Sequence, residues 1–133
     1  MPRRDLRIRP AIRIAAVLAV TAVALPASAV ADARPTLRCK SADLRYPFQP
    51  GGPNDFGVFR LRITGGHCPT AHRVAKRWMK RFEANLSAGH VKLPRSVDGF
   101  TFKSLPPTAA QTYNERGRRR TTTIRFDYRV PNG

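Results

Sequence analysis

Basic side chains are the residues in this sequence that could do chemistry with a partner. The chain holds 25 lysines and arginines against eight acids, a formal net charge of +17 at pH 7. Five cations recur at helical spacing and three form an arginine run, namely Arg73, Lys76, Arg77, Lys80, Arg81, Arg118, Arg119 and Arg120. Such a surface attracts anionic cell-wall polymers or membrane lipid headgroups. The alternative is a solvated surface, enriched in arginine by the codon bias of a high-GC genome.

Two cysteines, Cys39 and Cys68, are the next candidates for chemistry. An even number of cysteines in an exported chain favours a disulfide. The bond would close a loop of about thirty residues and add about 3–4 kcal/mol to the free energy of unfolding. A reactive thiol or a metal site would be the alternative, but no third cysteine or histidine pair at ligand spacing accompanies them.

Motifs for catalysis, cofactor binding or metal binding are missing from the sequence. It contains no G-x-S-x-G element, and its glycine pairs are typical of turns rather than of a phosphate-binding loop. His67, His72 and His90 have no partner pattern, and the first two would not share a helix face. Glu83 is expected to form an intrahelical pair with Lys80 or with a neighbouring arginine. We therefore expect no enzymatic activity, no cofactor and no metal.

The N-terminus has the three parts of a secretory signal peptide. Residues 1–13 are rich in arginine, residues 14–25 are an apolar run, and small residues follow. The apolar run would span about 18 Å as a helix, too short for a hydrocarbon core of about 30 Å. Cleavage after Ala29 or Ala31 fits equally well, and the route of export, general or twin-arginine, stays open.

Residues 1–31 are thus predicted to be removed, which leaves residues 32–133 as one small secreted domain. Its best-defined element is an amphipathic helix that starts near Pro69 and stops before Gly89. The apolar side, which we expect to pack on a sheet with Trp78 in the core, consists of Ala71, Val74, Ala75, Trp78, Met79, Phe82 and Leu86.

Alternating residues predict strands on both sides of this helix. In the strand at residues 58–64, Phe59, Leu61 and Ile63 would face the core, with Arg60 and Arg62 on the other side. Further strands are expected near Cys39 within residues 37–48, and at residues 99–102, 109–113 and 121–130; loops are expected at residues 49–55 and 114–120. This order indicates an α+β fold, one helix packed on a small antiparallel sheet.

The segment "HCPTAHRVAKRWMKR" resembles the C-x-T-A-x-x-V-x-x-x-W element of small exported actinobacterial proteins of unknown function. The resemblance covers about residues 65–128, and Gly99–Phe100 also fit the pattern of that group. Phe102 stands where the group often has a cysteine, and no later cysteine follows. The resemblance implies a small exported domain that lacks one disulfide of the group, and it implies no activity.

Two hypotheses for function follow. The first is a secreted or envelope-associated binding module that associates with anionic cell-wall polymer or a membrane surface through the eight cations named above. The second is a module or inhibitor that binds another secreted protein through loops 49–55 and 114–120. Sequence-specific binding to nucleic acid is not expected, since few aromatic residues lie among the cations.

Overall fold

The computed structural model describes residues 23–24 and 34–130. The predicted signal peptide and its cleavage site therefore fall outside the described residues, apart from residues 23–24. The elements after them are β1 (Thr36–Arg38), a short 3-10 helix η1 (Ala42–Leu44), β2 (Arg45–Tyr46), β3 (Phe56–Thr64), α1 (Cys68–Ser87), β4 (Ser96–Val97), β5 (Phe100–Leu105), β6 (Thr112–Arg119) and β7 (Thr122–Arg129).

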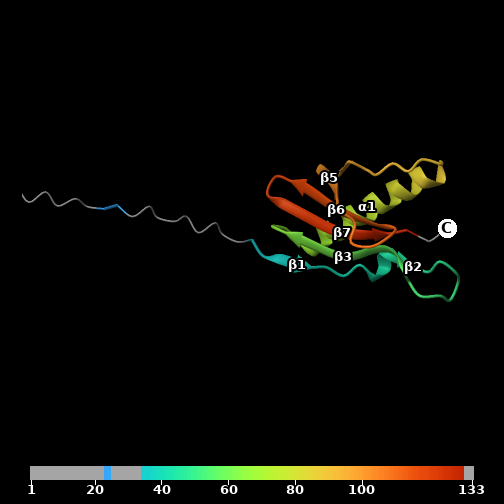
Figure 1. The fold of residues 1–133 in the computed structure, drawn as a ribbon. Coiled ribbons are helices and arrows are strands. Elements are labelled where there is room, and N and C mark those ends of the chain that lie inside the picture. The colour runs from blue at the N-terminus through green and yellow to red at the C-terminus, as the bar shows by residue number, and fades with distance from the viewer. Residues whose placement is uncertain (1–22, 25–33, 131–133) are drawn as a thin grey trace, which may run out of the picture. The chain divides into compact units, whose positions relative to one another are not determined.

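These strands form one antiparallel sheet with α1 on one of its faces, which confirms the predicted α+β fold (Figure 1). The strand order is β1-β3-β7-β6-β5-β4, and β2 continues along β3 beyond β1. The central strands β3 and β7 are separated in sequence by the helix and three other strands. The face of the sheet away from α1, called the open face below, has no second layer among the described residues (Figure 1).

Helix α1 begins and ends where the sequence predicts. His67 is the N-cap and Pro69 lies in the first turn, where its missing N–H is no loss. At the other end Gly89 takes a φ of +81°, and its N–H donates to the carbonyl of Leu86. The predicted apolar side is the buried side, although Leu86 is only partly covered.

Trp78 lies in the core, as predicted, with no exposed surface. Its ring centroid is 5.2–6.4 Å from the rings of four aromatic neighbours, namely Phe82, Phe102, Phe126 and Tyr128. Its indole N–H donates to the carbonyl of Pro94 at 3.2 Å, so the polar end of the ring is also satisfied. The aromatic cluster joins α1 to β5 and β7.

Strand β3 contains a bulge that makes the prediction for Phe59 wrong. The register to β7 shifts between Phe59 and Arg62, and Arg60 takes a φ of +50°. The extra residue turns Val58 toward the core and Phe59 toward the open face. Leu61 and Ile63, beyond the bulge, are buried as predicted.

The prediction of a loop at residues 114–120 is also wrong, because residues 114–119 belong to β6. Gly117 lies in the middle of this strand, where a Cβ atom would come within 2.5 Å of the Phe102 ring. The expected strand at residues 109–113 starts only at Thr112, and the one near Cys39 is divided into β1, η1 and β2. Residues 49–55 lie outside the helices and strands, as expected.

Candidate functional site

The predicted disulfide is present and joins the sheet edge to the helix. The Sγ atoms of Cys39 and Cys68 are bonded, and their Cα atoms are 5.3 Å apart. Cys39 follows β1, and Cys68 is the first residue of α1. Because β1 has only three register pairs with β3, this covalent link stabilises the position of the edge strand and of Arg38 at its end.

The basic side of α1 is exposed, as expected, but most of its cations contact acceptor groups of the protein itself. Arg77 donates to the Asp98 carboxylate at 2.5 Å, and Arg73 Nε lies 3.9 Å from the other oxygen of that carboxylate. Arg81 donates to the carbonyl of Ser96 at 2.7 Å. Lys76 and Lys80 have no such partner among the described residues. Three of the five predicted binding cations therefore hold the β4–β5 hairpin against the helix.

The arginine run at residues 118–120 does not act as one cluster. Arg118 lies on the open face of the sheet. Arg119 points to the other side, where it donates to the carbonyl of Asp98 at 3.1 Å and stacks 4.5 Å above the Phe100 ring. Arg120 lies in the turn between β6 and β7, with a φ of +52°. Successive strand residues alternate between faces, so a run of charges in a strand is divided between them.

The strand register assembles a row of basic residues that the sequence alone does not predict. Arg62 pairs with Arg125 across β3 and β7, and Arg125 pairs with Arg116 across β7 and β6. The row is completed at its ends by Arg38 on β1 and Lys103 on β5. We call these five residues the cationic row: Arg38, Arg62, Arg125, Arg116 and Lys103.

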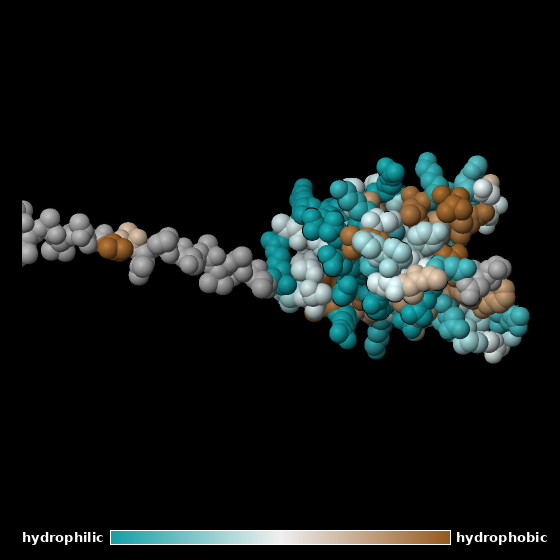
Figure 2. Space-filling view, in the orientation of Figure 1, coloured by the Kyte–Doolittle hydropathy of each residue, from teal (hydrophilic) through white to brown (hydrophobic). Residues whose placement is uncertain are grey.

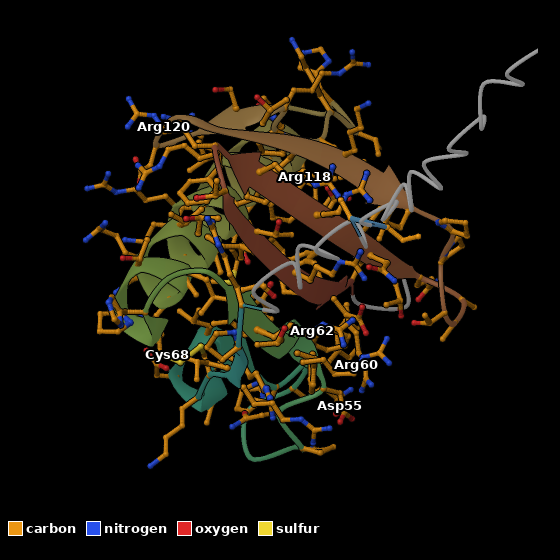
Figure 3. The ribbon with its side chains drawn as sticks, turned by 90° about the vertical axis from the view of Figure 1, so that its left-hand side faces the viewer. Asp55, Arg60, Arg62, Cys68, Arg118 and Arg120 are labelled. Atoms are coloured by element: carbon orange, nitrogen blue, oxygen red, sulfur yellow. A yellow bond between two sulfur atoms is a disulfide. The ribbon has the colours of Figure 1, made fainter. Side chains whose placement is uncertain are left out.

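All five members of the cationic row lie on the open face. Their neighbours along each strand, such as Ile63, Ile124 and Phe102, are buried beneath α1. Figure 3 shows Arg62 and Arg118 on the side of the sheet away from the helix, whereas Cys68 lies on the helix side. Adjacent strands are about 4.8 Å apart, so the row spans about 19 Å.

The cations of the row lie directly opposite one another on neighbouring strands, and none of them forms an ion pair with an acidic side chain among the described residues. Directly opposed residues have Cβ atoms about 5 Å apart, and like charges at that distance are destabilising. Among the described residues, no ion pair or side-chain hydrogen bond involves a guanidinium or ammonium group of the row. The acid on the same face, Asp127, is already paired with Arg60, whose Nε is 2.6 Å from its carboxylate. The charge of the row is therefore not neutralised by any ion pair within the described residues.

A row of mostly threonines runs parallel to the cationic row, two residues before or after it on each antiparallel strand. Its members, in strand order, are Thr36, Thr64, Thr123, Arg118 and Thr101. Two shallow hollows, of about 300 and 180 Å³, lie between the two rows and are lined by residues of both. Hydroxyl groups can donate or accept hydrogen bonds, so a ligand in these hollows would meet both charge and hydrogen-bonding groups.

On the side of the cationic row away from the threonines, the side chains of the open face contact one another. Phe59, turned outward by the bulge, lies 4.2 Å from the guanidinium carbon of Arg45 and 4.1 Å from that of Arg129. These cation–π contacts cover the ring and engage both charges. The Phe59 ring is therefore already occupied by two guanidinium groups and is not free to stack against a ligand.

Among the described residues Glu83 forms an ion pair neither with Lys80 nor with a neighbouring arginine, so that prediction is wrong. Its carboxylate accepts hydrogen bonds from the hydroxyls of Tyr46 at 2.7 Å and Tyr128 at 2.8 Å, which tie α1 to β2 and β7. Burial, together with these contacts, raises the pKa of the Tyr128 phenol, and burial raises that of Tyr46. Both phenols therefore stay protonated donors, which is a structural role.

Within residues 23–24 and 34–130, no group of three or more metal-ligating side chains is found. His72 lies 2.7 Å from the Asp43 carboxylate, a pair at the protein surface. No helix among the same residues is long and apolar enough to cross a membrane.

No protein family model, curated protein or solved structure matches this chain. The features that bear on its role are therefore those of the molecule itself: a disulfide-linked α+β domain whose open sheet face carries the cationic row.

Proposed function

We propose that this protein is an exported binding module that associates with a linear, phosphate-rich polymer of the cell envelope through the open face of its sheet. The observation that carries the proposal is the cationic row, five basic residues on five neighbouring strands. The predicted signal peptide supports export, and the disulfide fits an oxidising compartment. The resemblance to small exported proteins supports the same location.

The shape of the charged surface favours a chain-like ligand over a flat one. A polymer segment of about 19 Å could lie along the hollows, with its phosphates against the cations and its hydroxyls against the threonines. Membrane association usually adds apolar or aromatic side chains that enter the headgroup region. The exposed large hydrophobic residues of the domain, Leu37, Phe48 and Val91, belong to neither row. A membrane surface is therefore the second outcome to be tested.

The proposal is tested with poly(glycerol phosphate) as the probe. Each lost phosphate contact should reduce the slope of log affinity against log salt by about 0.7–0.9. The triple variant Arg62→Gln, Arg116→Gln and Arg125→Gln should therefore reduce that slope by about two and weaken binding at low salt. The matched control is Lys76→Gln, Lys80→Gln and Arg120→Gln, which removes the same charge from outside the row and should retain the slope.

Equal losses from both variants would show that only net charge matters, and no binding at low salt would refute the proposal. Vesicles with and without anionic lipid form the second arm of the experiment. Stronger binding to anionic vesicles than to the polymer would assign the open face to a membrane surface instead.

A further inference from the structure

A groove runs along the outer edge of β5, beside the end of the cationic row, and shares Lys103 with that row. It has a volume of about 940 Å³. One wall is the segment from Val91 to Arg95, and the other is β5 from Thr101 to Ser104, with Glu115 also lining it. Figure 2 shows hydrophobic surface on the same side of the molecule, where Figure 1 draws the chain that leaves the end of α1.

The edge of β5 presents main-chain hydrogen-bonding groups to this groove. Strand β4 covers only the start of β5, through the pairs Val97–Phe100 and Ser96–Thr101. The N–H of Phe102 still reaches the carbonyl of Arg95 at 2.8 Å. In an antiparallel strand the outward-pointing groups alternate, so the next outward residue is Ser104. No strand among the described residues pairs with Ser104 on this side.

The groove stays open because the chain opposite β5 is tied to the helix. The carbonyl of Pro94 accepts the indole N–H of Trp78, and the carbonyl of Lys92 accepts the side-chain amide of Asn85 at 2.7 Å. These bonds hold residues 91–94 on α1 and away from the edge of β5. An unpaired strand edge of this kind is a template for pairing with another chain.

The side chains around the edge indicate what an added strand would carry. On the helix side of the sheet the groove is lined by the apolar residues Val91, Leu93 and Phe102, together with Ser104 and the buried Glu115. Val91 is 74% exposed, although it is a large aliphatic residue. Lys103 projects from the open face, and Lys92 and Arg95 add positive charge to the groove. An added strand would therefore match best with apolar residues on one face and acidic residues on the other.

We propose that this groove binds an extended acidic segment of a partner protein as an additional strand beside β5, with apolar and acidic residues in alternation. The main-chain groups of Ser104 pair with the segment, the apolar residues contact Val91, Leu93 and Phe102, and the acids face Lys103 and its neighbours. A second copy of this strongly basic chain would bring like charge to the same edge. The occupant is therefore a different, acidic chain.

Glu115 repels the acidic side chains of such a ligand only weakly. It is 1% exposed, and its carboxyl group accepts a hydrogen bond from the Ser104 hydroxyl at 2.6 Å. Burial raises the pKa of this carboxyl group above its ordinary value, which favours the neutral form. The repulsion between Glu115 and the acids of an added strand is reduced accordingly.

The test uses an end-blocked seven-residue peptide of alternating glutamate and valine, with the full domain in its disulfide form. We expect saturable binding and slower hydrogen exchange of the Ser104 amide when the peptide is bound. Ser104→Pro removes the N–H that points into the groove and leaves the pairing with β6, because proline is tolerated at a strand edge. It should weaken peptide binding at least tenfold and leave binding to poly(glycerol phosphate) unchanged.

Two controls keep the test decisive. Ser104→Ala removes the same hydroxyl but keeps the N–H, and it should bind the peptide like the unchanged protein. If Ser104→Pro does not fold, peptides N-methylated at alternate residues replace it, and only one of the two methylation patterns should abolish binding. Equal binding of both patterns, or of a peptide with its glutamates and valines in separate blocks, would overturn the proposal. A homodimer whose Ser104 amide is protected without peptide would also overturn it, in favour of a second copy.

Discussion

The two basic surfaces of this domain differ in what their charges contact. On α1, Arg73 and Arg77 face the Asp98 carboxylate, and Arg81 reaches a hairpin carbonyl. On the open face of the sheet, the cationic row has no anion among the described residues. The comparison teaches that the density of positive charge in a sequence does not identify a binding surface. The useful distinction is whether the fold already supplies a counter-charge.

The largest expected loss of stability comes from a substitution in the aromatic core between helix and sheet, which supports both basic surfaces. Trp78→Ala should lower the free energy of unfolding by about 3–5 kcal/mol, because it deletes the centre of the aromatic cluster between helix and sheet. Chemical denaturation measures this loss. Trp78→Phe, which keeps part of the ring volume, should lose clearly less. Equal stability of Trp78→Ala and the unchanged protein would contradict the assigned core.

The disulfide is expected to have the next largest effect, and it concerns the sheet surface through Arg38. Replacing both Cys39 and Cys68 by alanine should cost about 2–5 kcal/mol of folding free energy. The unchanged protein under a strong reductant should show the same loss in denaturant unfolding, which is the matched control. An unchanged midpoint after reduction would show that the link contributes nothing.

Asp98→Asn distinguishes the helix surface from the sheet surface. It removes the counter-charge of Arg73 and Arg77, and it should destabilise the domain by about 1–2 kcal/mol, since both guanidinium groups are about half exposed and partly screened. Thermal unfolding at low and high salt measures the change. Asp55→Asn, a change in the exposed loop before β3, is the control and should have little effect. An equally small effect of Asp98→Asn would mean that the helix cations are as free as those of the row.

The smallest expected effect on stability is a slight gain instead of a loss. Arg116→Gln together with Arg125→Gln relieves repulsion within the cationic row, so it should leave the stability unchanged or raise it by a few tenths of a kcal/mol at low salt. Comparison with Arg77→Gln, which loses a partner, sharpens the contrast between the two surfaces. A clear loss of stability in the double variant would indicate that the row has a structural role.

The sequence predicts the parts of this fold that depend on local periodicity. The apolar side of α1, its ends at Pro69 and Gly89, and strand β7 are of this kind. Strand β6 was missed because its inward positions include Glu115 and Gly117, which hide the alternation of apolar and polar residues. The outward turn of Phe59 was missed because a bulge adds one residue to β3 and reverses the face of what precedes it.

The candidate site could be predicted only in part, because it depends on the pairing of distant strands. The cations themselves are visible in the sequence, but the cationic row exists only through the register of five strands. Arg62 and Arg125 are far apart along the chain and lie opposite each other in the sheet. The sequence also gives no sign that Asp98 folds back onto α1 through the β4–β5 hairpin. The one signal that could have located the row was the alternation of arginines in the strands at residues 58–64 and 121–130.

Binding of polymer by the cationic row is tested most directly by a titration with poly(glycerol phosphate), followed through the arginine side-chain Nε–Hε signals by nuclear magnetic resonance. We predict that the signals of the row arginines, Arg38, Arg62, Arg116 and Arg125, shift together and saturate. The signals of Arg73 and Arg77, which remain engaged with Asp98, should move little. Larger or earlier shifts of Arg73 and Arg77 than of the row arginines would assign the binding surface to the helix instead of the open face.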